Sequence, residues 1–304
     1  MQQQSDAVFM MRPAAFDFNP ETAPSNAFQQ EGDSTHVLEK VCAEFDAMVA
    51  RLRENGIHVF VFEDTLLPKK PDAIFPNNWI SLHHDGRVVL YTMLAKNRRT
   101  ERRIDILEKI QTDFVIKQLI DISDGETEEV FLEGTGSIVF DHQKKIAFAC
   151  RSPRTNENLL KKLCAEVGYT AHCFDAFDSA GKAIYHTNVL MAIGKNWSVC
   201  CLDSVHEKDR ERLKNQLENN GSLVEISFEQ MNHFAGNMLG LSSASGDFIV
   251  LSQSAFDALN MQQKEQLKRA AKLLPIAIPT IEKHGGGSVR CMLAEVFLPK
   301  KEKE

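Results

Sequence analysis

The sequence predicts an α/β protein in which five repeated strand–strand–helix–strand (ββαβ) units form a ring around a central cleft. Three observations support this prediction: four stretches of the chain share one order of elements, the stretches are evenly spaced, and the two chain ends together supply a fifth copy. Ring closure also pairs strand edges that an open array of units would expose. The alternative is two adjacent α/β domains whose spacing agrees by chance.

Each of the four stretches contains two β-rich runs, a turn and an amphipathic helix. In one of them the runs Ser137–Phe140 and Lys145–Cys150 flank a polar turn, and Thr155 or Asn156 is a suitable N-cap for the helix that follows. Another carries the turn signal Asp85–Gly86 between its two runs. The stretches are residues 75–110, 133–163, 186–218 and 234–270.

The two chain ends supply the fifth unit. Gly285–Pro299 provides one strand, Val8–Arg12 provides its neighbour, and Ser34–Asn55 has the apolar periodicity of a long amphipathic helix. We therefore predict a single domain over residues 1–304, in which the N-terminal strand pairs with the C-terminal strand. The apolar face of the helix comprises Val37, Val41, Phe45, Met48 and Leu52. At intervals of about 50 residues, the first strands of the units are expected to begin near Phe75, Glu133, His186, Phe234 and Cys291.

The composition is that of a globular protein and disfavours several classes of partner. The 304 residues are 43% hydrophobic and 25% charged, and a net charge of −7 argues against a nucleic-acid-binding surface. No apolar run approaches the length of a membrane span, and the first residues lack the order of a secretory signal. The seven cysteines include no Cys-x-x-Cys pair, which argues against a disulfide framework or a structural zinc site. We expect a cytoplasmic protein without nucleic-acid or membrane partners.

The ring predicts a functional site at its centre. If the units are equivalent, their first strands start at one shared end, so Glu133, His186 and Cys291 converge in one cleft. Cys291 follows three glycines and Arg290, a setting that favours a reactive thiolate. His186 stands at the head of the apolar run Val189–Ile193 and suits general acid–base catalysis, whereas Glu133 suits recognition of N–H donors. The alternatives are a structural histidine, a surface acid and a cysteine that packs as a small hydrophobe, as expected for Cys42, Cys164, Cys200 and Cys201.

Further charged residues are candidates for substrate binding. Asp72 lies between two prolines, where a simple turn residue is the alternative. Arg98, Arg99 and Arg154 are candidates for gripping a carboxylate, because a guanidinium group binds one in a bidentate manner. A solvated surface position is the alternative for each arginine. Residues 16–33, rich in Asn, Pro, Ser and Gln, form either a lid over the cleft or a surface loop.

Four stretches of the sequence are distinctive: PDAIFPNNW, EGTGSIVFDHQKKIAFACRSPRTN, YHTNVLMAIG and GGGSVRCMLAEVF. Together they resemble the guanidino-group-modifying enzyme superfamily, whose members have the pentein fold, a five-bladed α/β propeller. The superfamily includes arginine deiminases, dimethylarginine dimethylaminohydrolases, succinylarginine dihydrolases and glycine amidinotransferases. The resemblance extends from Val8 to Pro299 and points to the arginine-deiminase-related branch that includes citrulline-using hydrolases.

The resemblance implies a role for each candidate residue. Cys291 is implied to be the nucleophile, His186 the general acid and base, and Glu133 the acid that orients His186 or the substrate's N–H groups. Asp72 is implied to hold the far end of the substrate's N–C–N unit, and Arg154 to bind the α-carboxylate. The substrate is implied to be a small amino acid, with no cofactor and no metal, and a homo-oligomer is left open. The other implied substrate contacts are Phe75, which packs on the substrate stem, Asn77, Asn78, Arg98, Arg99 and Asn188.

Two amides stand where the superfamily's deiminases usually carry acids, at Asn78 and Asn188. A buried guanidinium ion requires carboxylate partners, whereas an uncharged amide suits a neutral ureido group, whose oxygen accepts hydrogen bonds. The amides therefore favour citrulline-like over arginine-like substrates, although succinylarginine dihydrolases also lack the standard acid and take a guanidino substrate.

The sequence thus predicts a cofactor-free hydrolase that cleaves a linear C–N bond of a guanidino or ureido group through a covalent intermediate on Cys291. One alternative is an amidinotransferase, in which an amine acceptor replaces water. Another is a non-catalytic protein that binds an amino acid, and the intact set of Cys291, His186 and Glu133 argues against it. A third is an α/β protein with none of these roles.

Overall fold

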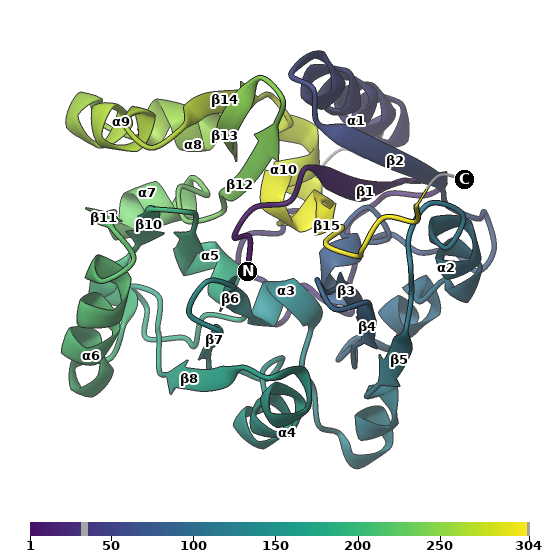
Figure 1. The fold of residues 1–304 in the computed structure, drawn as a ribbon, viewed down its shortest axis with the longest axis horizontal. Coiled ribbons are helices and arrows are strands. Elements are labelled where there is room, and N and C mark those ends of the chain that lie inside the picture. Colours follow the sequence, from purple (N-terminus) through teal and green to yellow (C-terminus); the bar gives the residue numbers. More distant parts are fainter. Residues whose placement is uncertain (32–35, 303–304) are drawn as a thin grey trace.

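Five three-stranded sheets surround a common centre in the computed structural model, which describes residues 1–31 and 36–302 (Figure 1). The strands are β1 (Ala7–Arg12), β2 (His58–Glu63), β3 (Ile80–Leu82), β4 (Arg87–Leu90), β5 (Gln118–Asp121), β6 (Val139–Asp141), β7 (Ile146–Cys150), β8 (Thr170–Phe174), β9 (Met191–Ile193), β10 (Trp197–Cys200), β11 (Ser222–Glu225), β12 (Leu239–Ser243), β13 (Gly246–Ser252), β14 (Lys272–Ile276) and β15 (Ala294–Glu295). They form the sheets β15–β1–β2, β3–β4–β5, β6–β7–β8, β9–β10–β11 and β12–β13–β14.

All five sheets have the same topology. The first two strands of each sheet are antiparallel, and the second and third are parallel. In the sheet built from both chain ends, β15 takes the place of the first strand, with Val8 of β1 opposite Glu295. The mixed α/β class and the five repeats predicted from the sequence are therefore confirmed.

A helix connects the second and third strands of every sheet, because parallel neighbours require a crossover connection. These helices form the outer part of the molecule (Figure 1). They are α1 (Val37–Glu54), α2 (Ile104–Ile110), α4 (Glu157–Val167), α6 (Glu207–Glu218), and the pair α8 (Gln253–Ala258) and α9 (Met261–Lys268).

Two of these helices show how closely the sequence pattern fixes an element. The apolar face predicted for α1 is buried throughout, and the helix begins at Val37; residues 34 and 35 of the predicted range lie outside the described residues. Helix α4 begins after Asn156, whose side chain accepts a hydrogen bond from the backbone N–H of Leu159. Asn156 rather than Thr155 is therefore the N-cap.

Short helices precede the first strands, and two of them, α3 (Gly134–Ser137) and α5 (Thr187–Leu190), lie near the centre of the ring (Figure 1). The others are α7 (Phe228–Asn232), α10 (Pro279–Gly285), and the 3₁₀ helices at Pro76–Asn78 and Val289–Met292; three further 3₁₀ helices span Lys96–Glu101, Ser123–Glu128 and Leu202–Ser204.

The short helices correct one prediction, since the first strands begin a few residues later than expected. The apolar run Val189–Ile193 is not one strand: its first two residues belong to α5, and His186 is the N-cap of that helix. The helical turn lets Thr187 Oγ1 donate to the carbonyl of Ser137 at 2.6 Å. This bond links two neighbouring units.

The apolar core lies between neighbouring sheets. One cluster, for example, joins Val89 of β4 and Tyr91, which follows that strand, to Phe140 and Ala147 of the next sheet and to Leu160 of α4. Comparable clusters join the other neighbouring pairs. Within the described residues, no helix combines the length and the apolar character needed to cross a membrane.

Candidate active site

The short helices at the centre bring together side chains from distant parts of the chain. Cys291 lies in the 3₁₀ helix Val289–Met292, His186 and Glu133 directly precede α5 and α3, and Asn78 ends the 3₁₀ helix Pro76–Asn78. One cavity is lined by Thr22, Asn26, Asp72, Phe75, Asn78, Arg98, Arg154, Tyr185, His186, Gly285, Gly286, Gly287 and Cys291. The convergence predicted from the ring is thus present for His186 and Cys291.

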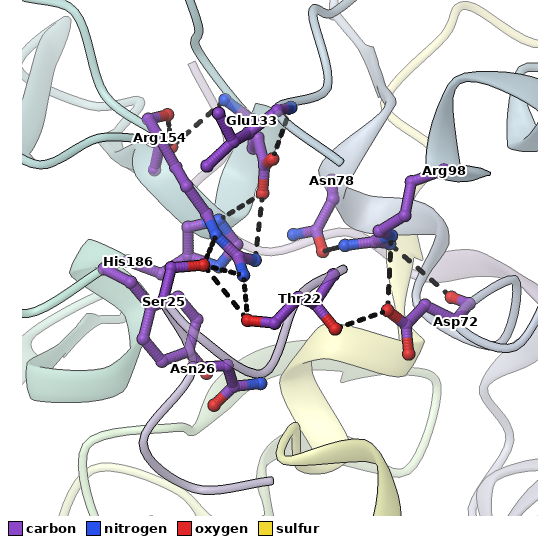
Figure 2. Close-up of polar contacts among 12 residues, drawn as sticks. Thr22, Ser25, Asn26, Asp72, Asn78, Arg98, Glu133, Arg154 and His186 are labelled. Carbon is purple, nitrogen blue, oxygen red and sulfur yellow. Dashed lines mark hydrogen bonds and ion pairs between the residues drawn. The ribbon is translucent and has the colours of Figure 1, made fainter. Parts of the chain in front are cut away.

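Glu133 stands directly behind His186. Its carboxylate Oε2 lies 2.8 Å from His186 Nε2 and 3.3 Å from Arg154 Nη1 (Figure 2). Oε1 accepts a hydrogen bond from the backbone N–H of Leu94 at 3.0 Å. Glu133 is fully buried, so each of these bonds replaces one that water would make. The bond to Nε2 leaves His186 Nδ1 as the ring atom for proton transfer; within residues 1–31 and 36–302 it makes no hydrogen bond.

For both Glu133 and His186, burial and the partner's charge shift the pKa in opposite directions. Burial alone would raise the pKa of Glu133, but the charges of Arg154, His186 and Arg98 outweigh it and hold that pKa well below its usual range. Burial lowers the pKa of His186 to about 4, while Glu133 acts in the opposite direction. At neutral pH the pair is therefore an ionised carboxylate behind a neutral imidazole, which is the state of a general base.

Two side-chain amides point at the sulfur of Cys291. Asn237 Nδ2 lies 3.3 Å from Sγ, and Asn188 Nδ2 lies 3.5 Å from it. Cys291 is 6% exposed, so the sulfur has little contact with solvent. All seven cysteines of the chain are free thiols; Cys164, Cys200 and Cys201 are buried as predicted, whereas Cys42 is only partly buried.

On the other side of the cavity, Arg98 organises a second polar cluster. Its Nε and Nη2 donate to both carboxylate oxygens of Glu101, at 2.9 to 3.2 Å. Its Nη1 donates to Asn78 Oδ1 at 2.8 Å, and Nη2 also contacts the carbonyl of Phe75 at 3.3 Å. Every nitrogen of the guanidinium group is thus engaged by the protein, and Asp72 Oδ2 lies 3.8 Å away.

Residues 16–31, which we call the strap, pass over the cavity between these two clusters (Figure 2). Thr22 bridges them: Oγ1 donates to Asp72 Oδ2 at 3.2 Å, and its carbonyl accepts from Arg154 Nη2 at 3.2 Å. Ser25 Oγ accepts from the same arginine at 2.6 Å, and Asn19 Nδ2 donates to Asp72 at 2.7 Å. The cavity beneath the strap measures about 20 Å³, which is room for about one water molecule. The described part of the predicted segment 16–33 is therefore a cover over the cavity; residues 32 and 33 lie outside the described residues.

Glycines let the central side chains approach one another. A Cβ atom at Gly136 would lie 2.4 Å from Asn78 Nδ2 and 2.7 Å from His186 Nδ1. A Cβ at Gly287 would lie 2.9 Å from the ring of Phe75. All three distances are too short for real contacts, so the absence of a side chain at these two positions shapes the cavity.

Three of the residues predicted to bind substrate do not line the cavity. Asn188 directs its Nδ2 at Cys291 Sγ instead, 3.5 Å away. Asn77 is buried and donates to Thr135 Oγ1 at 3.2 Å, behind the cavity wall. Arg99 pairs with Glu126 at 3.4 Å and donates to the carbonyl of Met93. Arg98 and Arg154 both line the cavity, but in this structure the protein's own groups occupy their donors.

Other residues of the site were not predicted from the sequence. Asn237 occupies the same place in its repeat as Asn188, so the repeat pattern contained the signal for it. Glu101 stands three residues after Arg98, a spacing at which side chains meet on a helical turn. The segment 16–33 was recognised as a lid or a surface loop, but nothing in the sequence singled out Thr22 and Ser25 within it. Within the described ranges, no group of three or more His, Cys, Asp or Glu side chains is placed to hold a metal ion.

Comparison with solved structures shows that the fold is shared with enzymes of guanidino chemistry. The N-terminal domain of ArgZ, an arginine dihydrolase from the ornithine–ammonia cycle in cyanobacteria, bound to substrate, matches with a TM-score of 0.75 at 15% identity, over 96% of this chain and 98% of that one. Full-length ArgZ matches over 41% of its length, so the chain spans about two fifths of that protein. DDAH from Pseudomonas aeruginosa, complexed with citrulline, matches with a TM-score of 0.68 at 14% identity, over 96% and 99% of the two chains. At 14–15% identity, these matches show that the fold is shared and nothing further.

Sequence comparison places the chain in a family. None of the curated proteins matches it. The model of the eukaryotic N,N-dimethylarginine dimethylhydrolase family matches residues 12–298, which includes every residue of the candidate site. The chain therefore belongs to the eukaryotic N,N-dimethylarginine dimethylhydrolase family.

Proposed function

We propose that the protein is a cofactor-independent cysteine hydrolase that cleaves a linear C–N bond of a guanidino or ureido group on a small amino acid. The observation that carries the proposal is the cavity that Cys291 and His186 line together, with the ionised Glu133 behind the histidine. The five sheets are accordingly interpreted as the blades of an α/β propeller, and residues 1–304 as one pentein domain. A cytoplasmic location and a homo-oligomer stay predictions.

The geometry supports a two-stage reaction. The proton of Cys291 Sγ passes to His186 Nδ1, and the sulfur attacks the central carbon of the planar N–C–N or N–C–O group. The protonated His186 gives its proton to the leaving nitrogen as the C–N bond breaks, and ammonia or an amine departs. A water molecule then loses a proton to His186 and attacks the same carbon. The C–S bond breaks, and the proton returns to the sulfur.

Glu133 supports both stages without taking a proton. Its carboxylate fixes the ring of His186 through Nε2 and stabilises the imidazolium ion that forms when Nδ1 receives the proton. Arg154 Nη1 donates to the same carboxylate oxygen, Oε2, at 3.3 Å. The low pKa of Glu133 keeps it ionised in every step.

Two unpartnered atoms on the cavity wall support recognition of a ureido group. Asn78 Nδ2 and Asp72 Oδ1 are buried and make no hydrogen bond within the described residues. Because Arg98 occupies Asn78 Oδ1, the amide presents its N–H donors to the cavity, and such donors suit a ureido oxygen. Asp72 Oδ1 suits an N–H group of the same substrate. A guanidino group fits less well, since it offers only donors at neutral pH.

Binding requires the strap to move, because a cavity of about 20 Å³ cannot hold an amino acid. Withdrawal of Thr22 and Ser25 frees Arg154 for the substrate's carboxylate and frees Asp72 Oδ2 for its N–H groups. The contacts that the strap makes to Arg154 and Asp72 are thus replaced by equivalent contacts to the substrate.

The proposal is tested by measuring the ammonia and the amines (methylamines, ornithine) formed from a panel of arginine, citrulline, N-methylated arginines, agmatine and N-acylarginines, each with and without glycine. We expect hydrolysis of citrulline or an arginine derivative at a rate independent of glycine. Turnover that requires glycine would identify an amidinotransferase instead, and no turnover of any member would contradict the proposal.

Asn78→Asp is expected to raise activity on guanidino substrates relative to ureido substrates. The new carboxylate replaces the N–H donors that suit a ureido oxygen and supplies the charge that a guanidinium ion requires. We expect the ratio of kcat/KM for arginine to that for citrulline to rise by about tenfold or more, since hydrogen bonds to charged groups contribute about 1.5–3 kcal/mol. The matched control is Asn77→Asp, which should leave the ratio unchanged because Asn77 lies behind the wall. An unchanged ratio in Asn78→Asp would refute this role for Asn78.

The pH profile of kcat/KM should have its acid limb near pH 4. The pKa of His186 is lowered to about 4, so the neutral imidazole that accepts the thiol proton predominates above that pH and is lost as the pH falls through it. Glu133 raises the pKa of His186, so Glu133→Gln should move this limb to lower pH. Assays after brief exposure to each pH, with activity re-measured at neutral pH, separate titration from unfolding. An acid limb near pH 6.5, the ordinary value for histidine, would show that burial does not control the base.

A further inference from the structure

One position of the repeated unit carries a small polar side chain in all five units. In each case two apolar residues follow it and lead into the first strand, as in Asn237-Met238-Leu239. None of these five side chains is more than 6% exposed. The nucleophile is therefore one member of a set that the repeat brings to the centre: Asn78, Ser137, Asn188, Asn237 and Cys291.

Asn237 is held in one orientation by both ends of its amide. Its Oδ1 accepts a hydrogen bond at 3.1 Å from the backbone N–H of Arg290, the residue directly before the nucleophile. Its Nδ2 donates to the carbonyl of Asn188 at 3.0 Å and to Cys291 Sγ at 3.3 Å. Since Oδ1 is fixed by a backbone donor, the NH₂ group must face the sulfur.

The arginines nearby direct their hydrogen bonds to other groups than the sulfur of Cys291. The guanidinium group of Arg290 is directed at the carbonyl of Thr135, with Nη1 2.5 Å from that oxygen. Arg98 and Arg154 are engaged by Glu101 and Glu133. Within the part of the chain that the structure describes, the hydrogen bonds to the sulfur come from Asn188 and Asn237.

We propose that Asn237 is a further catalytic residue, whose amide stabilises the negative charge that forms on Cys291 Sγ when its proton passes to His186. The inference rests on the proposed function, because it takes Cys291 as the nucleophile. Hydrogen bonds to ionised groups are stronger than those between neutral groups, so the bond from Nδ2 favours the thiolate over the thiol. The amide is already oriented before the charge appears, so no reorganisation opposes the step.

The test is the alkylation rate of Cys291 by iodoacetamide in Asn237→Asp, followed against pH by mass spectrometry of the peptide that contains Cys291. The aspartate keeps an oxygen for the N–H of Arg290 but replaces the NH₂ donor with a second oxygen facing the sulfur. The matched control is Asn220→Asp, because Asn220 is also a buried asparagine whose Nδ2 donates twice, to the carbonyls of Gly194 and Trp197, but in a different part of the ring.

We expect Asn237→Asp to slow alkylation at pH 7 by about tenfold or more and to move the midpoint of rate against pH upward by at least about one unit. Asn220→Asp should change the unfolding temperature but not the pH midpoint of the alkylation rate. If folded Asn237→Asp is alkylated at the wild-type rate and with the wild-type pH midpoint, the inference is overturned. If that variant does not fold, Asn237→Ser, which also lacks the amide donor but adds no charge, must show the same slowing.

This measurement is independent of turnover. If the wild-type protein hydrolyses no guanidino or ureido compound but Asn237→Asp still slows alkylation, the proposed function fails and the contact between the amide and the thiolate stands. If turnover is found and alkylation is unaffected in Asn237→Asp, the proposed function stands and the role of Asn237 fails.

Discussion

Cys291→Ser is expected to reduce turnover by on the order of 10³-fold or more while leaving the fold intact. Serine fills nearly the same volume and can accept both amide hydrogen bonds, but its hydroxyl does not ionise near neutral pH, so neither His186 nor the amides can convert it into a nucleophile. The measurement is kcat for the best substrate of the panel, with thermal unfolding as the check on folding.

The matched control for this variant is Cys42→Ser. Cys42 is a partly buried thiol on α1, where its Sγ lies 3.8 Å from the carbonyl of Pro13. The Cys42→Ser variant should retain the wild-type kcat. Full activity in Cys291→Ser would end the proposal of a covalent mechanism on this residue.

His186→Ala should lower kcat by about 10²–10⁴-fold, the usual contribution of a general acid–base residue. Without the imidazole, the thiol has no acceptor for its proton and the leaving nitrogen has no donor. The carboxylate of Glu133 also loses one partner but keeps Arg154 and the N–H of Leu94, so it remains hydrogen-bonded. KM should change far less than kcat, because the carboxylate and stem of the substrate are bound by other residues.

His172→Ala is the control for loss of a buried histidine. Burial lowers the pKa of His172 to about 4, as it does for His186, but its ring packs on Phe148 in another part of the ring. We expect a lower unfolding temperature with kcat retained. If His172→Ala and His186→Ala lose activity equally, the effect of His186 is one of stability and the acid–base role is refuted.

The sequence predicted the fold well because the fold repeats itself. Five copies of one pattern of apolar runs and turns had to place equivalent residues at one end, and this placed His186 and Cys291 in one cavity although 105 residues separate them. The helical turns before the strands were missed, because a short apolar run such as Val189–Ile193 has no periodicity that separates strand from helix.

The predicted roles of the arginines depended on contacts that sequence does not show. Arg98 was expected to be free to grip a carboxylate, but Glu101 already binds it through both oxygens. Arg154 is held by Glu133 and by the strap, whose closure over the cavity has no counterpart in the pattern of the repeat. Such contacts are set by three-dimensional packing between units, whereas the position of Asn237 follows from the repeat and could have been predicted.

The central claim is that Cys291 is a nucleophile within a site that binds the amidine or ureido group of a substrate. The most direct test is inactivation by 2-chloroacetamidine, an amidine that alkylates thiols, with and without citrulline or arginine. We predict loss of activity together with one label on Cys291, and slower labelling when substrate is present. Loss of activity with Cys291 unlabelled, or labelling of Cys291 that leaves activity intact, would contradict the account.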